Sequence, residues 1–297
     1  MEMAEAKKKP TLEELTMLFH VLIILNDRGG TRKSTFLIML LGMLLMAQIK
    51  ARGMEIDDQD RVARLFGDLV KTLTLSPAEF LTKSTAADTG RLAPFLTALE
   101  RPDPTCPLIV EIGANLSDRV AEVLVRNKVG REAQRANCRI GILTMIDGTD
   151  DGLALGAHSA QLLKAALPSA EILVVQPSAD LGIDPNSRGM SQAARDGYLE
   201  IVQPAIASDR KIVWPMLGRD AMRAFEKLRL TPGDFLAADP RKVGEAGYDA
   251  GVMDFQADAD TLYWIGRRFK ADFEIHFAEL MEEVQSKLGF PLDGPAA

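Results

Sequence analysis

The chain has 297 residues, 47% hydrophobic and 26% charged, which are ordinary values for a globular protein. Its formal net charge of −7 speaks against a protein that holds nucleic acid by itself, because phosphate contacts need clustered Lys and Arg, so direct DNA binding is not expected. Two cysteines, Cys106 and Cys138, without a CxxC pair favour a reducing, cytoplasmic compartment over a disulfide-stabilised secreted protein.

Short apolar segments alternate with helix-like segments along most of the chain. The expected strands are 20–25, 54–57, 108–112, 140–146, 172–175 and 211–214, and the expected helices lie near 34–51, 60–72, 88–100, 117–136, 151–165 and 188–199. The strands are continuous runs of Ile, Val and Leu, so both faces of the sheet are expected to be buried. This pattern predicts an α/β three-layer sandwich with a mainly parallel sheet and right-handed crossovers.

The end of the chain has a different character. Residues 220–260 are richer in Pro, Gly, Ala and Asp, so a loop-rich excursion is expected there. From near Asp260 apolar residues recur every three to four positions, which predicts an amphipathic helix within 258–290. No linker divides the chain, so residues 1–297 are expected to form one domain, with 1–17 as a tail.

Two segments raise the question of a membrane, and both argue against one. The longest apolar run, Phe36–Ala47, has about twelve residues, whereas a bilayer span needs roughly twenty. The polar face of the last helix carries Glu274, Glu279, Glu282 and Glu283, and an anionic leaflet would repel that acidic half. We therefore expect this helix to pack on the sheet or on a partner.

The segment NDRGGTRKST, residues 26–35, joins the first apolar strand to the first helix. A phosphate-binding loop needs this position, a turn whose backbone N–H groups face an anion, a Lys for the outer phosphates and a hydroxyl for Mg²⁺. Gly29 and Gly30 permit the turn, Lys33 supplies the ammonium, and Ser34 supplies the hydroxyl. The dipole of the following helix adds to the attraction. The alternative is a plain Gly-Gly turn between a core strand and a core helix, with a solvated basic cluster.

The order Arg-Gly-Gly-Thr-Arg-Lys-Ser over residues 28–34 resembles the KGGxGK[ST] loop of the MinD/ParA group of P-loop ATPases. The resemblance implies ATP and Mg²⁺ as ligands and a nucleotide-sandwiched homodimer in which Arg28 reaches the partner's phosphate. The cofactor-binding residues of the loop would be Gly29, Gly30, Thr31, Arg32, Lys33, Ser34 and Thr35. Arg32 stands where the group has Gly, which alone adopts left-handed backbone angles without penalty. Strain of roughly 1–3 kcal/mol and crowding of the phosphates are therefore expected there.

Acidic residues follow the next two strands in the order that the resemblance implies. Asp58 would lie near Mg²⁺, and Asp60 would orient the attacking water. In EIGAN, residues 111–115, Glu111 stands where the group has Asp and would contact Mg²⁺ directly or through water. This segment resembles the D-x-G-A-N element of plasmid stability and conjugal-transfer proteins in the group, typified by StbB and TraL. For Asp58 and Asp60 the alternative is a polar start to the next helix, where Asp is favoured anyway.

Two later positions are expected near the base of the nucleotide. The strand that ends at Gln176 resembles the one that ends in Asn for adenine recognition in the group, and a side-chain amide can donate to and accept from a purine edge. Pro215 lies in a loop that also resembles the group. The alternative for Gln176 is a strand-end residue in a turn before Pro177.

The resemblance as a whole implies an ATP-binding nucleotide switch with protein partners in plasmid conjugal transfer or partition. Arg28, Lys33 and Asp60 would be its catalytic residues. The departures from the group's pattern leave open whether ATP is hydrolysed. The alternative is a degenerate P-loop protein of the same fold that acts as a non-catalytic scaffold for transfer or partition factors.

Overall fold

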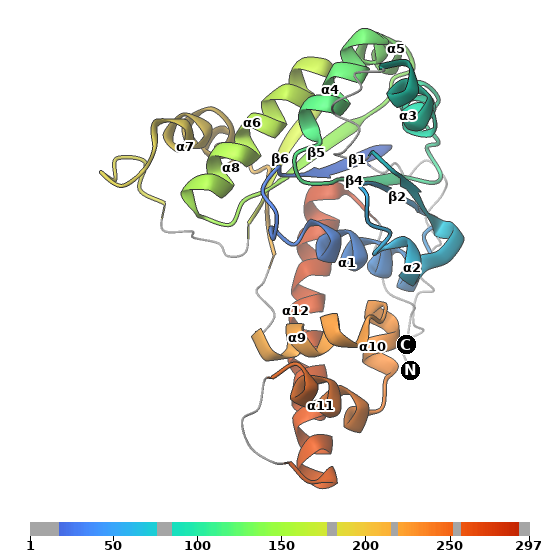
Figure 1. Ribbon diagram of the computed structural model, residues 1–297, viewed down its shortest axis with the longest axis vertical. Coiled ribbons are helices and arrows are strands. Elements are labelled where there is room, and N and C mark those ends of the chain that lie inside the picture. The colour runs from blue at the N-terminus through green and yellow to red at the C-terminus, as the bar shows by residue number, and fades with distance from the viewer. Residues whose placement is uncertain (1–17, 76–84, 177–182, 215–218, 252–256, 291–297) are drawn as a thin grey trace, which may run out of the picture.

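A computed structural model describes residues 18–75, 85–176, 183–214, 219–251 and 257–290 (Figure 1). The strands are β1 Val21–Leu25, β2 Arg52–Ile56, β3 Val70–Leu73, β4 Leu108–Ile112, β5 Ile140–Met145, β6 Glu171–Gln176 and β7 Lys211–Val213. The helices up to β7 are α1 Lys33–Met46, α2 Ala63–Phe66, α3 Thr85–Glu100, α4 Ser117–Arg126, α5 Val129–Arg135, α6 Asp150–Ala166, α7 Gln192–Gly197 and α8 Gln203–Ala207. After β7 come α9 Arg219–Leu228, α10 Pro232–Ala237, α11 Pro240–Asp249 and α12 Ala259–Leu288.

The seven strands form one parallel sheet in the order β3-β2-β4-β1-β5-β6-β7. Every residue of β1, β4 and β5 is buried, as continuous apolar strands require when helices cover both faces. The predicted α/β sandwich with a mainly parallel sheet is confirmed. Because the strands are parallel, the carboxyl ends of β1, β2 and β4 lie at the same edge.

Side chains that alternate along β1 enter two separate cores. Val21, Ile23 and Leu25 pack with the helices α3, α4, α5 and α6. Leu22 and Ile24 pack on the opposite face, against α1 and the later part of α12. Figure 1 shows these two helical layers above and below the sheet. None of the helices in the described ranges has the length and apolarity that crossing a bilayer requires.

Two expected helices differ from the observed structure. The segment 60–72 was expected to be one helix, but only Ala63–Phe66 is α-helical, and Val70–Leu73 pairs with β2 as an edge strand. Gly67, with φ 55°, turns the chain between them. The expected helix 117–136 is two helices, because Lys128 adopts left-handed angles, with φ 57° and ψ 27°.

The expectation of a loop-rich excursion at 220–260 was wrong for most of that segment. The helices α9, α10 and α11 occupy it, and with the first half of α12 they form a C-terminal module that extends away from the sheet (Figure 1). The Pro and Asp residues that suggested loops begin helices. Pro232 and Pro240 occupy first-turn positions, and Asp239 caps α11 by accepting from the Arg241 N–H.

Glycines let α11 and α12 approach each other closely. A Cβ on Gly266 would lie 1.7 Å from the Pro240 carbonyl oxygen, and one on Gly244 would lie 2.0 Å from that of Leu262. Gly244, one of the glycines that raised the loop expectation, is therefore a packing residue. The final helix begins at Ala259, close to the start expected from its periodicity.

Candidate functional site

The backbone between β1 and α1 turns through two left-handed residues. Gly30 has φ 78°, and Arg32 has φ 60° and ψ 27° directly before α1 begins at Lys33. Arg32, which stands where the motif of the group has Gly, thus has the backbone angles that glycine adopts readily. For a residue with a Cβ this conformation costs roughly 1–2 kcal/mol.

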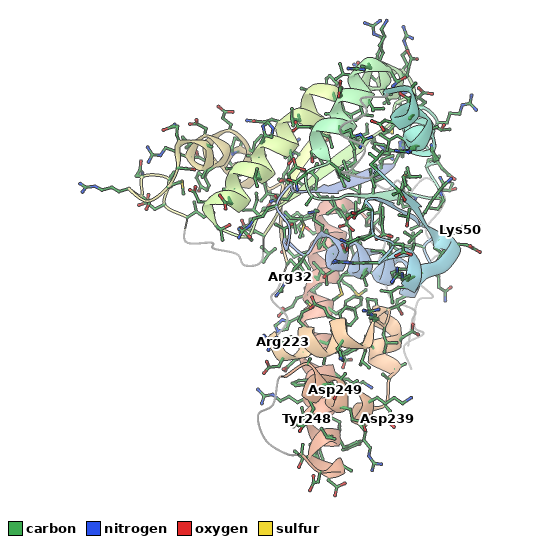
Figure 2. The ribbon with its side chains drawn as sticks, in the orientation of Figure 1. Arg32, Lys50, Arg223, Asp239, Tyr248 and Asp249 are labelled. Atoms are coloured by element: carbon green, nitrogen blue, oxygen red, sulfur yellow. The ribbon has the colours of Figure 1, made fainter. Side chains whose placement is uncertain are left out.

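This loop forms one wall of a cleft of about 950 Å³. The lining residues are 29–35 and 38 from the loop and α1, 57–61, 64 and 65 around the end of β2 and α2, 111 and 114 at the end of β4 and just after it, and 225, 226, 229 and 230 from α9 and the turn that follows it. Figure 2 shows Arg32 at the end of α1 that faces α9, and Lys50 beyond the far end of the same helix. The C-terminal module therefore contributes a wall that the sequence did not predict.

Lys33 lies inside the loop. Its Nζ donates to the carbonyl oxygen of Asn26 at 2.7 Å and to that of Arg28 at 3.3 Å, and the residue is only 6% exposed. Burial lowers the pKa of this ammonium, and the nearby carboxylates of Glu111, Asp27 and Asp57 oppose that shift. The ammonium is therefore held inside the loop by two backbone carbonyls.

Ser34 and Glu111 meet beside the lysine. The Ser34 hydroxyl donates to Glu111 Oε1 at 2.8 Å, while Glu111 Oε2 is buried without a hydrogen-bond partner. Burial raises the pKa of Glu111 to about 7, although the Ser34 hydroxyl and the Lys33 ammonium act in the opposite direction. An unpartnered buried carboxylate oxygen is costly unless a proton or a cation satisfies it.

Asp57 is an acidic cleft residue that sequence reasoning missed. It was read as the last residue of a strand, but it lines the cleft and is the carboxylate after β2 that acts on both Lys33 and Glu111. Burial raises its pKa to about 6. A Cβ on Gly113 would lie 2.8 Å from the Asp57 carboxyl carbon, so the glycine of EIGAN leaves room for this side chain.

Asp58 and Asp60 also line the cleft, at its more exposed side. Asp60 pairs with Arg64 at 2.6 Å, and this bond lowers the pKa of its carboxyl. The structure therefore brings both residues to the cleft mouth, while their roles toward Mg²⁺ and water remain predictions.

The first two residues of the loop, Asn26 and Asp27, are held by hydrogen bonds to neighbouring elements of the fold. The Asn26 amide donates to the carbonyl oxygens of Met145 at 2.6 Å and Gly152 at 3.0 Å. The buried Asp27 carboxylate accepts from the Ser117 N–H at 3.2 Å and from the Ser159 hydroxyl at 2.9 Å. These bonds connect the loop to β5, α4 and α6. Sequence reasoning treated Asp27 only as a mismatch.

Arg28 pairs within the chain. Its Nη1 lies 2.8 Å from Asp147 Oδ2 and also donates to the Thr149 hydroxyl, in the turn between β5 and α6. Thr149 in turn caps α6 through the Gly152 N–H. The expected role of Arg28 on a partner's phosphate remains a prediction, and in this state its guanidinium is held by its own chain.

The remaining expected site residues have different positions. Thr31 and Thr35 line the cleft, and the Thr31 hydroxyl donates to the Arg28 carbonyl oxygen at 3.3 Å. Gln176 is buried at the end of β6, two strands from β1 in the sheet order, and its carbonyl accepts from the Trp214 N–H at 2.7 Å. Pro215 lies outside the described residues.

The donor set at the cleft suits magnesium. Ser34 Oγ, the Glu111 carboxylate and the Asp57 carboxylate are oxygen groups, which Mg²⁺ prefers. Within the described ranges no group of three His, Cys, Asp or Glu residues is arranged to hold a metal unaided. Mg²⁺ usually keeps several waters and takes further oxygens from a bound phosphate.

Comparisons with known proteins give little further help. No family model matches the chain, and no curated protein matches it. Among solved structures, a chain of the MinC:MinD cell division protein complex of Aquifex aeolicus is similar at 9% sequence identity and a TM-score of 0.36. The similarity covers 80% of this chain and 98% of that chain.

Proposed function

We propose that the chain is a nucleotide switch that binds ATP with Mg²⁺ in the cleft at the end of β1. The observation that carries the proposal is the left-handed backbone at Gly30 and Arg32, which turns the loop into the cleft just before α1 begins. A helix N-terminus that follows such a turn attracts phosphate through its dipole and its N–H groups. Lys33 places a cation at the same point.

The chain's own groups have distinct tasks in this proposal. Lys33 neutralises phosphate charge, and Ser34 and Glu111 hold Mg²⁺. The Ser34 oxygen would offer its lone pairs to the metal while its O–H continues to donate to Glu111 Oε1. Asp57 and Asp58, which line the cleft, would accept hydrogen bonds from water around the metal, and Asp60 would orient the attacking water. Bound Mg²⁺ would supply charge stabilisation of the phosphates.

Arg28 is the proposed dimer residue. When a second copy closes over the nucleotide, Arg28 exchanges Asp147 for a phosphate of the partner's nucleotide. Guanidinium suits both ligands, because its planar fork binds carboxylate and phosphate alike. Gln176 and Pro215 are proposed near the base. The EIGAN segment supports a role with partners in plasmid conjugal transfer or partition, inside the cytoplasm.

A titration of labelled ATP with Mg²⁺ tests the proposal. Saturable binding is expected for the natural chain, and Lys33→Ala should weaken it at least about tenfold, which corresponds to about 1.4 kcal/mol. Lys50→Ala is the matched control, since Lys50 is an exposed lysine beyond the opposite end of α1. Equal affinity of the Lys33 and Lys50 variants would exclude a role for this loop.

A non-catalytic scaffold is the second candidate. It is favoured by the Lys33 ammonium, which already donates to two loop carbonyls, and by Arg32, which adds a side chain to the phosphate space. A well-folded chain that binds no nucleotide would support it. The partners and the choice between transfer and segregation are best approached through neighbouring genes and pull-down from the same cell.

A further inference from the structure

One face of α12 is exposed along most of its length. The helix has 30 residues, about 45 Å at 1.5 Å per residue. Phe269, Phe273 and Phe277 lie on its buried face. The opposite face carries exposed residues that we name the α12 strip: Trp264, Arg268, Ala271, Ile275, Ala278 and Glu282. At 3.6 residues per turn these six fall on one side of the helix.

Two of the six residues of the strip are large, apolar and exposed. Trp264 is 63% exposed and Ile275 is 57% exposed. A single exposed apolar residue needs no explanation, but two large ones on the same helix face indicate contact with another surface. Ala271 and Ala278 leave room for a partner to approach closely. Tyr263 packs edge-on against the Trp264 ring at 5.6 Å, and Arg267 lies 5.3 Å from its centre, so the indole is held in place.

The charges of the strip are arranged symmetrically about Ile275. Arg268 lies two helical turns before Ile275, and Glu282 lies two turns after it. If a second α12 packs antiparallel about a two-fold axis at Ile275, each Arg268 faces Glu282 of the other copy. The same register places Ala271 beside Ala278. The surface is therefore complementary to itself, as a two-fold interface requires.

We propose that the α12 strip is a homodimer interface, in which two chains pack their α12 helices antiparallel with Ile275 at the two-fold axis. The residues described as lining the cleft include none from α12, so this contact needs no nucleotide. It is separate from the nucleotide-sandwiched dimer proposed above and stands or falls independently. The match of Arg268 with Glu282 in this register favours a second copy as the occupant of the strip.

Sedimentation velocity of the full chain without nucleotide, from about 1 to 100 μM, tests the interface over the range of a moderate dimer. A monomer–dimer equilibrium is expected. Ile275→Glu places two carboxylates at the axis and should weaken dimerisation at least about tenfold. Val125→Glu is the matched control, since Val125 is 59% exposed on α4, away from the strip, and this variant should dimerise like the natural chain.

A charge exchange separates the interface from simple misfolding. Arg268→Glu alone and Glu282→Arg alone should each be monomeric, because like charges then face each other across the axis. An equimolar mixture of the two variants restores opposite charges and should form heterodimers. Recovery of the dimer in the mixture requires that both variants are folded.

Three results would overturn the proposal. They are a natural chain that stays monomeric over the whole range, an Ile275→Glu variant that dimerises unchanged, and a mixture that remains monomeric. A monomeric chain whose Trp264 emission shifts to the blue with phosphatidylserine vesicles would also overturn it, because the strip would then be a membrane surface. Trp214 is buried at 7% exposure, so Trp264 is the tryptophan expected to respond.

Discussion

The connection between β1 and α1 has two halves that are held in different ways. Asn26, Asp27 and Arg28 are tied to the scaffold by hydrogen bonds to β5, α4 and α6 and to the turn before α6. Residues 29–34 instead line the cleft, where the Lys33 ammonium donates to two loop carbonyls and the Ser34 hydroxyl donates to Glu111. The first half is an anchor, and the second half is a binding surface.

The difference between the anchor and the binding half explains how the chain accommodates its departures from the common phosphate-binding loop pattern. Asp27 and Arg28 are accommodated in the anchor, where carboxylate and guanidinium each find partners within the chain. Arg32 lies in the binding half, where it keeps left-handed angles. A substitution in the anchor should therefore change stability first, whereas a substitution in the binding half should change charge, pH dependence and ligand affinity.

The largest expected effect concerns Glu111 and pH. The folded chain holds a proton on Glu111 up to about pH 7, whereas the unfolded carboxyl releases it near 4.5. The folded state thus binds more protons between these values, so the free energy of unfolding should fall as pH rises through this window. A difference of this size is on the order of 3 kcal/mol. Glu111→Gln should remove this part of the slope, measured by urea unfolding across the window.

The control for that experiment is Glu122→Gln. Glu122 pairs with Arg126 on the exposed side of α4, so its loss should leave the pH slope unchanged. An unchanged slope in Glu111→Gln would mean that Glu111 is ionised in the folded chain, for example by moving toward Lys33. The binding half would then be less desolvated than its geometry indicates.

The anchor is tested by Asp27→Ala. Loss of its carboxylate leaves the buried Ser117 N–H without its acceptor and removes the bond from the Ser159 hydroxyl, which keeps the Leu155 carbonyl oxygen as an acceptor. The free energy of unfolding should fall by roughly 2 kcal/mol. Ser159→Ala removes only one of the two bonds and should cost roughly half as much. Chemical unfolding at neutral pH measures both.

The same variant shows whether the two halves are coupled. If the anchor positions the binding half, Asp27→Ala should also weaken binding of ATP with Mg²⁺. Unchanged affinity in a destabilised variant would show that residues 29–34 keep their conformation without the anchor. The hypothesis that the anchor positions the binding half would then be wrong.

The sequence could predict those parts of the molecule that depend on local pattern. Six strands, the layer architecture and the position of the loop followed from apolar runs and glycine spacing. The turn at Arg32 was anticipated from its place in the motif, and its backbone angles bear this out. These features need only neighbours along the chain.

The features that the sequence could not predict depend on contacts between residues far apart in the chain. The burial of the Asp27 carboxylate depends on its bonds from Ser117 and Ser159, which lie 90 and 132 positions away in the sequence. Strand β3 was hidden because Val70–Leu73 is short and follows a helix-like stretch, and only pairing with β2 makes it a strand. The Pro and Asp residues of 220–260 read as loop formers, yet they begin helices whose stability comes from packing on α12.

The smallest expected effect concerns Arg32, and it separates strain from binding. Arg32→Gly relieves a left-handed conformation but adds backbone freedom to the unfolded chain, so a net gain of about 0.5–1 kcal/mol is expected. Lys128→Gly, at φ 57° before α5, should gain the same amount. Since Lys128 lies outside the cleft lining, only Arg32→Gly should also raise the affinity for ATP. Equal stabilisation with lower affinity in Arg32→Gly would show that the guanidinium binds phosphate, and that its strain serves the binding half of the loop.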